Sequence, residues 1–277
     1  MSSGRRLAGA ISKHALLIVA SVIALFPVYV MLTAAFKTQA GFLEHPWAPV
    51  SHPTLSGFRT ALSDQFPRWF GNTLFLSFSS VLITLFVSAL AAWGFAHWDF
   101  WGRDVVLGVL VALMVVPPVV LLVPLFVFGV RIGQISTFRL VIVIYVGLML
   151  PFSVYMLTNF FRTIPASMIE AAVIDGCSSW RVFRRIVLPL SAAPVVTLGV
   201  VNLLWVWNEL LIALVFLQDD SKKTLMVGIT GFQSRYSLDV PAIMAGLTLA
   251  TLPIVTVYIF GQRYFQRGLV AGALKGE

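Results

Sequence analysis

The sequence predicts an all-α membrane protein with six transmembrane helices. Of its 277 residues, 59% are hydrophobic and 11% are charged, whereas soluble domains carry about 45–50% apolar and about 25% charged residues. Apolar runs of about 20 residues, the length that crosses about 30 Å of hydrocarbon, recur along the chain. Open strands would leave backbone groups unsatisfied in lipid, and the runs lack the alternation of a transmembrane barrel, so we expect helices.

Six runs have this length, and we expect them to form a single transmembrane domain over residues 1–277. The chain has too few charged side chains, 19 Lys and Arg and 11 Asp and Glu, to cover a soluble domain as well. The expected spans are residues 15–36, 72–95, 105–128, 140–161, 191–217 and 241–260, with a long loop at 162–190 and a tail at 261–277.

The first run follows a basic segment that contains Arg5, Arg6 and Lys13. This start is typical of a signal peptide, but the run of about 22 residues exceeds a signal core of about 7–15 residues, and Pro27 lies inside it. We therefore expect an uncleaved first span. The proline-rich residues 37–71 predict extended backbone with short amphipathic pieces.

The third run contains Pro117, Pro118 and Pro124. Proline lacks a backbone donor and crowds the preceding turn, so we expect a kinked or broken helix here. Such breaks line the pathway in many transporters. A kink that serves packing alone is the alternative.

The loop at 162–190 predicts two short helices at the membrane surface. Pro165 is well placed to begin the first helix, and Gly176 can take the positive φ that ends it. Ser178 or Ser179 can cap the second helix, which ends near Pro189. The expected docking surface for another protein combines apolar and basic side chains: Ala172, Trp180, Phe183, Arg181, Arg184 and Arg185.

The same loop carries a pattern of fixed residues at fixed gaps. Glu170-Ala171-Ala172 is followed by Gly176 and, after nine intervening residues, by Ile186-x-Leu188-Pro189. The pattern resembles the EAA signature of binding-protein-dependent ABC importer permeases. Further matches resemble the second, shorter permease of the carbohydrate, maltose-type branch: Asp175 before Gly176, Pro117-Pro118 with Pro124, Trp207-Asn208-Glu209, and Gly268-Leu269 through Gly272 and Lys275-Gly276.

One segment departs from that branch. After Gly133, where relatives often have L-x-N-T, this chain has Gln134-Ile135-Ser136-Thr137. The departure argues against assigning the substrate of any one relative. A monosaccharide, disaccharide, oligosaccharide, polyol or glycerophosphate all fit the resemblance.

The resemblance implies a transport subunit without an ATPase site of its own. No G-x-x-x-x-G-K-[ST] segment is present in the sequence, so ATP and Mg²⁺ are expected on partner subunits. The implied partners are a second homologous permease in a heterodimer, two copies of a nucleotide-binding ATPase subunit and an extracytoplasmic solute-binding protein. The residues expected to contact the ATPase are Glu170, Ala171, Ala172, Asp175, Gly176, Trp180 and Phe183. A surface helix that only anchors to lipid headgroups is the alternative.

The fifth run holds an acidic residue, Glu209, at membrane depth. At 100° per residue, Asn202, Trp205 and Glu209 share one stripe of a continuous helix, with Trp207 nearly opposite. Aromatic rings and amide or carboxylate acceptors suit sugars, so we expect this stripe, together with Asn208, to line the substrate pathway. The alternative is that Glu209 bonds a neighbouring helix or the partner permease, and that the tryptophans serve packing or the interfacial belt.

The tail contains glycines spaced four apart, which we expect to lie outside the last span in a flexible segment. By resemblance, Gly272, Lys275 and Gly276 reach the ATPase interface. Placing both termini in the cytoplasm puts eleven of the 19 basic residues on that side, in agreement with the positive-inside rule. The resemblance implies a multi-pass protein of the bacterial plasma membrane, the inner membrane.

Other classes of protein fit less well. An ion-coupled secondary transporter is the main alternative, but the spans offer Glu209 no evident basic partner and show no internal repeat. A channel would need a pore loop or a ring of charge, and the sequence shows neither. An intramembrane hydrolase would need a nucleophile and a base at the same depth in the membrane, and the sequence shows no such pair. One cysteine and four scattered histidines predict no metal site, and no basic run predicts nucleic-acid binding.

Overall fold

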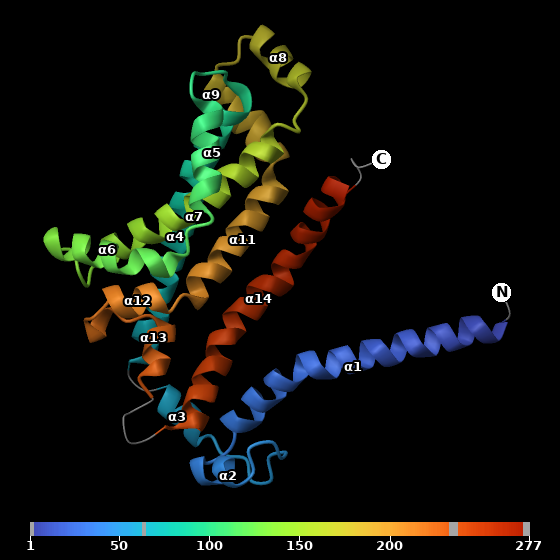
Figure 1. Ribbon diagram of the computed structural model, residues 1–277, viewed down its shortest axis with the longest axis vertical. Coiled ribbons are helices and arrows are strands. Elements are labelled where there is room, and N and C mark those ends of the chain that lie inside the picture. Colours follow the sequence, from blue (N-terminus) through green and yellow to red (C-terminus); the bar gives the residue numbers. More distant parts are fainter. Residues whose placement is uncertain (1–2, 63–64, 233–237, 274–277) are drawn as a thin grey trace. The chain divides into compact units, whose positions relative to one another are not determined.

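The computed structural model describes residues 3–62, 65–232 and 238–273, which form helices joined by turns and short loops. Figure 1 labels most of these elements. The helices are α1 (Ser3–Ala35), α2 (Gln39–Glu44), α3 (Ser56–Ala61), α4 (Phe66–His97), α5 (Arg103–Leu113), α6 (Pro118–Arg131), α7 (Phe138–Phe161), α8 (Ala166–Ile174), α9 (Ser179–Val182), the π-helix η1 (Phe183–Val187), α10 (Leu188–Leu190), α11 (Ala192–Asn208), α12 (Leu211–Phe216), the 3₁₀-helix η2 (Asp220–Lys222), α13 (Leu225–Thr230) and α14 (Val240–Ala273).

The chain divides into two compact units, described separately. The first comprises Met1–Pro67 with Gly228–Leu252. Its small core contains three fully buried alanines, Ala35, Ala61 and Ala245. Such small side chains let helices approach closely, and a Cβ on Gly57 of α3 would lie 2.7 Å from the carbonyl oxygen of Pro241.

A buried lysine organises the loop of this first unit. Lys37 is 6% exposed, and its Nζ donates hydrogen bonds to the carbonyl oxygens of His45 (2.8 Å), Pro46 (3.3 Å) and Ala48 (2.7 Å). An ammonium group has three donors, so these three acceptors satisfy it fully. The helices α2 and α3 are the short pieces predicted between residues 37 and 71.

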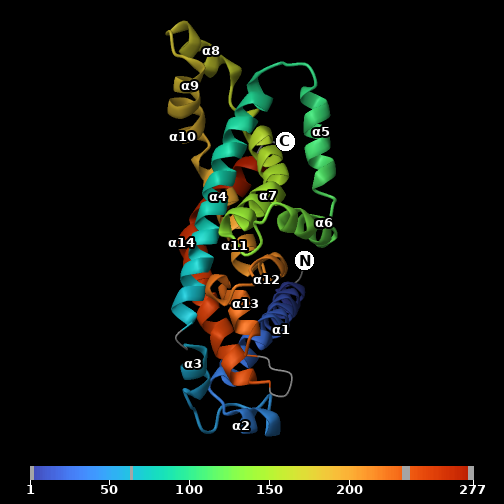
Figure 2. The same cartoon turned by 90° about the vertical axis from the view of Figure 1, so that its left-hand side faces the viewer.

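The second unit comprises Arg68–Val227 with Pro253–Glu277 and contains the long helices α4, α7 and α11 (Figure 2). Its buried apolar side chains form two separate clusters. One combines residues of α4 and α7 with α12, and the other combines the last turns of α4 and α7 with α8, α9 and η1. The second cluster fastens the loop at 162–190 to the ends of the long helices.

The structure confirms an all-α membrane protein. Four helical segments are long and apolar enough to span a membrane, namely Ser12–Ala35, Phe66–His97, Phe138–Phe161 and Val240–Phe260. Two bent pairs bring the number to as many as six if each pair is one span. The third span is one of these pairs: α5 and α6 meet at 99° directly before Pro118, which confirms the predicted break.

Two expectations are corrected. The continuous helix predicted over 191–217 is wrong, because α11 ends at Asn208 and Glu209 adopts extended backbone (φ −70°, ψ 125°) before α12 begins. The Glu209 side chain supplies the physical reason, since it bonds backbone N–H groups of α12 instead of continuing the first helix. The flexible tail is also wrong as far as Ala273, because α14 continues to that residue. Lys275 and Gly276 lie outside the described residues.

Candidate functional site

The loop between α7 and α11 begins with a sharply bounded helix, α8. Pro165 stands at its N-cap with extended ψ, and Gly176 follows its end at φ 76°. The N–H of Cys177 donates to the carbonyl of Ala172 (2.9 Å), and the N–H of Gly176 donates to that of Val173 (3.0 Å). This pair of bonds is a Schellman motif, which satisfies the last carbonyls and fixes the exit of the chain. The predicted positive φ at Gly176 is confirmed.

The second half of the loop is a continuous helix with a π-helical centre. It runs through α9, η1 and α10 from Ser179 to Leu190 and meets α11 at 75°. The π-turn ends two residues before Pro189, whose ring would clash with the carbonyl of Arg185 in a regular α-helix. The wider turn relieves that clash. The two predicted surface helices are therefore present.

The predicted docking residues divide into two sets. Glu170, Ala171, Asp175, Gly176 and Trp180 are exposed. Ala172 and Phe183 are 8% and 2% exposed and pack into the chain's own core, which corrects their place on the docking surface. Helical periodicity groups residues by face, but it does not say which face meets the chain and which meets a partner.

Three exposed apolar side chains of α8 were not predicted from the sequence. Met168 is 42% exposed, Val173 is 57% exposed and Ile174 is 85% exposed. Val173 and Ile174 follow Glu170 at helical i+3 and i+4 spacing, which would have placed them beside it on the surface. Figure 1 shows α8 at one end of its bundle, beyond α9 and the end of α7.

A second candidate site lies where the two broken spans meet. A pocket of about 270 Å³ opens between the break before α6 and the break before α12. Its lining is mostly apolar, with one aromatic ring and one carboxylate: Pro117, Pro118, Val119, Leu122, Trp205, Glu209, Leu211 and Ile212. The predicted pathway residues Trp205 and Glu209 thus line one pocket.

The carboxylate of Glu209 is held by three donors. Its Oε1 accepts from the N–H of Ile212 (2.7 Å), and its Oε2 accepts from the N–H of Ala213 (3.0 Å) and from the hydroxyl of Tyr145 on α7 (2.7 Å). The Trp205 ring meets Tyr145 edge to face, with centroids 5.7 Å apart. Glu209 therefore caps α12 and bonds a neighbouring helix while it lines the pocket.

The other pathway candidates lie apart from this pocket. Asn202 is 4% exposed and donates to Ser153 Oγ on α7 (3.1 Å). Asn208 is exposed, and its Nδ2 donates to the carbonyl of Leu204 in its own helix (2.7 Å). Trp207 is 3% exposed and packs edge to face on Phe70. The structure brings Trp205 and Glu209 together and leaves Asn202 and Asn208 outside the lining.

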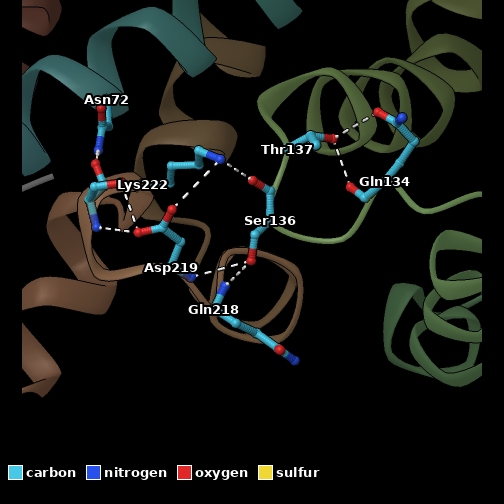
Figure 3. A network of polar contacts seen from close by, with 8 residues as sticks. Asn72, Gln134, Ser136, Thr137, Gln218, Asp219 and Lys222 are labelled. Carbon is cyan, nitrogen blue, oxygen red and sulfur yellow. Dashed lines mark hydrogen bonds and ion pairs between the residues drawn. The ribbon is translucent and has the colours of Figure 1, made fainter.

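The far end of α12 is clamped by a residue in the left-handed region. Ser136 has φ 58°, its N–H donates to the carbonyl of Phe216 (2.8 Å), and its Oγ accepts from the N–H groups of Gln218 (3.0 Å) and Asp219 (3.2 Å) (Figure 3). Its carbonyl accepts from Lys222 Nζ (2.7 Å). This residue lies in the segment that departs from the L-x-N-T pattern.

Asp219 completes this network. Hydrogen bonds from the Ser221 hydroxyl (2.7 Å) and the Ser221 N–H (2.9 Å) hold the pKa of the exposed Asp219 carboxyl below its usual value. Lys222 Nζ lies 3.7 Å from the other carboxylate oxygen. The clamp therefore joins the start of α7 to the segment after α12 with an ionised carboxylate at its centre.

Comparison with known proteins agrees with this arrangement. Residues 84–270 match the family described as binding-protein-dependent transport system inner membrane component. The chain is 40% identical to ABC transporter permease protein ORF2 of Caldicellulosiruptor sp. (strain Rt8B.4), covering 92% of this chain and 94% of that protein. It is 32% identical to the trehalose/maltose transport system permease protein MalG of Thermococcus litoralis, covering 94% and 95%.

A solved structure shows the same fold. The crystal structure of a bacterial ABC transporter involved in the import of the acidic polysaccharide alginate contains a chain that superposes with a TM-score of 0.82. The match covers 96% of this chain and 99% of that one at 21% identity. The family match and the similarity along nine-tenths of the chain lead to one conclusion: the chain belongs to the binding-protein-dependent transport system inner membrane components, the permease subunits of ABC transporters.

Proposed function

We propose that this chain forms part of the membrane pathway of an ATP-driven importer for a sugar or sugar-like solute, which a separate solute-binding protein delivers. The observation that carries the proposal is the pair of exposed apolar side chains, Val173 and Ile174, that flank Glu170 on α8, a short, sharply bounded helix at the end of the bundle of an ABC permease. The relative named for trehalose and maltose supports a sugar as the solute.

The ATPase partner is expected to receive α8 in an apolar cleft. Val173 and Ile174 supply the apolar contact, and the exposed carboxylate of Glu170 between them can pair with a basic group of the cleft. Two ATPase subunits would bind ATP and Mg²⁺, one beneath this chain and one beneath a second, homologous permease. This arrangement places the loop at 162–190 and both termini in the cytoplasm, and the chain in the bacterial inner membrane.

Closure of the ATPase pair then drives alternating access. The Schellman exit at Gly176 and the packed residues Ala172 and Phe183 fix α8 to the bundle, so displacement of α8 moves the helices behind it. Packed helices move as nearly rigid bodies between a few discrete arrangements. An inward-open pathway can thereby become outward-open.

The pocket at the two helix breaks is the proposed stretch of pathway in this chain. The half-buried Trp205 ring offers a face for the C–H side of a sugar. Oε1 of Glu209 accepts one hydrogen bond within the chain and keeps a second lone pair for a solute hydroxyl. Monosaccharides, oligosaccharides, polyols and glycerophosphates remain the candidate classes.

Purification of the tagged chain from its native membrane tests the assembly. We expect an ATPase subunit and a second permease to co-purify with it in a ratio of two to one to one. Thermal-shift screening of the cognate binding protein against sugars and polyols identifies the solute. A chain that purifies without an ATPase, and whose uptake activity depends on a proton or sodium gradient, would instead be an ion-coupled transporter.

A further inference from the structure

An aromatic latch joins the loop at 162–190 to the end of α4. We define the latch as Trp93 and His97 of α4 with Trp180 and Phe183 of the loop. Ring centroids are 4.2 Å apart for Trp93 and His97, 6.0 Å for Trp93 and Phe183, and 5.5 Å for Trp180 and Phe183. Trp93 is 6% exposed and Phe183 is 2% exposed, so the contact lies inside the chain.

One hydrogen bond sets the register of the latch. Trp93 Nε1 donates to Ser179 Oγ in the first turn of α9 (3.2 Å), across 86 residues of sequence. Aromatic contacts tolerate sliding, whereas a hydrogen bond requires one distance and one direction. A buried indole N–H also needs a partner, so the bond makes the loop and α4 move together.

The other end of α4 is bonded to the segment that follows α12. Thr73 Oγ1 accepts from the buried N–H of Leu225 (2.8 Å). Asn72 Nδ2 donates to the carbonyls of Ser221 (3.0 Å) and Lys223 (2.9 Å). Trp93 follows Asn72 by 21 positions, which correspond to about 30 Å at 1.5 Å per residue.

The sequence makes α4 the least interrupted of the long helices. Pro67 is the second residue of α4 and the shorter α11 has Pro194 in its first turn, whereas α1, α7 and α14 contain Pro27, Pro151 and Pro253 in their interiors. The third span is broken outright. A helix without such interruptions transmits displacement along its axis with little bending.

The buried face of α4 combines large side chains, such as Leu76 and Trp93, with small ones. It carries small hydroxyl residues at helical spacing, all 2% exposed or less: Thr73, Ser77, Ser80, Thr84 and Ser88. Small side chains let neighbouring helices approach closely. The hydroxyls of Ser77, Ser80 and Thr84 make no hydrogen bond with the described residues. These three side chains therefore do not fix the position of α4 along its axis through polar contacts.

We propose that α4 is a transmission rod that carries motion of the docking loop to the segment after α12. Trp93 is the positioning residue at one end, and Thr73 and Asn72 are the positioning residues at the other. The inference rests on the proposed function, because it takes an ATPase at the loop as the source of motion. It adds the route by which that motion reaches the opposite end of the bundle.

Trp93→Phe and Ser179→Ala test the loop end of the rod. Phe keeps the ring and loses the donor, and Ala removes the acceptor with little change in volume. In the complete complex in proteoliposomes, we expect each variant to lower solute uptake per ATP hydrolysed by about three- to tenfold, the effect of losing a buried hydrogen bond. The double variant should be no worse than either single variant, because the two residues share one bond.

Thr73→Val tests the opposite end. It removes the acceptor for Leu225 while keeping the side-chain shape, and we expect the same loss of uptake per ATP. Ser80→Ala is the matched control on the same buried face, because its hydroxyl makes no hydrogen bond. Trp101→Phe is the control for the indole, since Trp101 is fully exposed. Both controls should keep wild-type uptake per ATP.

The outcomes separate the two hypotheses. If the unaltered complex shows no ATP-driven uptake, the proposed function fails whatever the variants do. If the unaltered complex transports and Ser179→Ala and Thr73→Val both keep wild-type uptake per ATP, the transmission role of α4 is overturned. A purely structural role would lower the amount of assembled complex in these variants and leave uptake per ATP unchanged, which also overturns the proposal.

Discussion

At the scale of single residues, Glu209 combines structural and pathway chemistry. Its two carboxylate oxygens accept three hydrogen bonds that hold α12 to α7. A glutamine at this position has one acceptor oxygen, and its NH₂ group would face a backbone donor. The side chain therefore contributes to stability through its two acceptor oxygens, whether or not a solute touches it.

Glu209→Gln should lower the free energy of unfolding by about 1–3 kcal/mol, because at least one buried N–H loses its acceptor. Thermal unfolding of the purified complex measures this. Asn208→Ala is the neighbouring control, since Asn208 is exposed and bonds its own helix, and it should change stability little. Wild-type uptake by Glu209→Gln, measured well below its unfolding temperature, would remove the pathway role and leave the cap.

Ser136 gives a second residue-scale prediction. Its positive φ costs about 1–2 kcal/mol for a residue with a Cβ. Ser136→Ala loses the hydroxyl that accepts hydrogen bonds from two N–H groups and keeps the backbone strain of the positive φ. Ser136→Gly loses the same hydroxyl but relieves that strain. We expect Ser136→Ala to unfold at a lower temperature than Ser136→Gly. The opposite order would contradict a strained backbone at this position.

At the scale of elements, the end of α8 depends on the glycine that follows it. A Cβ on Gly176 would meet no atom within 4 Å, so Gly176→Ala causes no steric clash with a neighbour. The substitution is unfavourable only because φ is 76°, a backbone conformation that alanine rarely adopts. We expect it to loosen the Schellman motif, at about 1 kcal/mol, and to weaken ATPase binding in a titration with the purified ATPase. Gly108→Ala in α5 is the control: its Cβ also meets open space, its backbone is helical, and binding should not change. Equal effects of the two substitutions would argue against the role of the exit.

The elements of this loop were predictable because their boundaries are local. Pro165, Gly176 and Pro189 act on their own backbone, so the sequence shows where the two short helices start and stop. The break at Pro117 and Pro118 was predictable for the same reason. The break at Glu209 was not, since an acidic residue in an apolar run has the same pattern in a continuous helix. Its partner Tyr145 lies 64 residues away.

The candidate site was partly predictable for a related reason. Periodicity placed Trp205 and Glu209 on one face, and both residues line one pocket. It also placed Asn202 on that face, where the structure shows a bond to Ser153 on another helix. Which residues of a face reach a cavity depends on neighbouring helices, and the sequence does not place those neighbours.

At the scale of the whole molecule, the chain is a permease subunit, and α8 is its proposed docking helix. Ile174→Asp puts a charge into the most exposed apolar position of α8, 85% exposed. We expect the ATPase to be lost on co-purification while the two permeases remain together, because an unpaired charge in an apolar cleft is costly. Ile132→Asp, at the C-cap of α6, is the control and should retain the ATPase. Retention of the ATPase by Ile174→Asp would show that α8 is not the docking helix.

The source of energy tests the central claim most directly. The complex of both permeases and the ATPase is reconstituted in proteoliposomes with the solute-loaded binding protein outside and ATP inside. We predict solute uptake that requires ATP hydrolysis and binding protein and that is unchanged by ionophores which collapse proton and sodium gradients. Uptake that persists without ATP and stops when those gradients collapse would contradict the account.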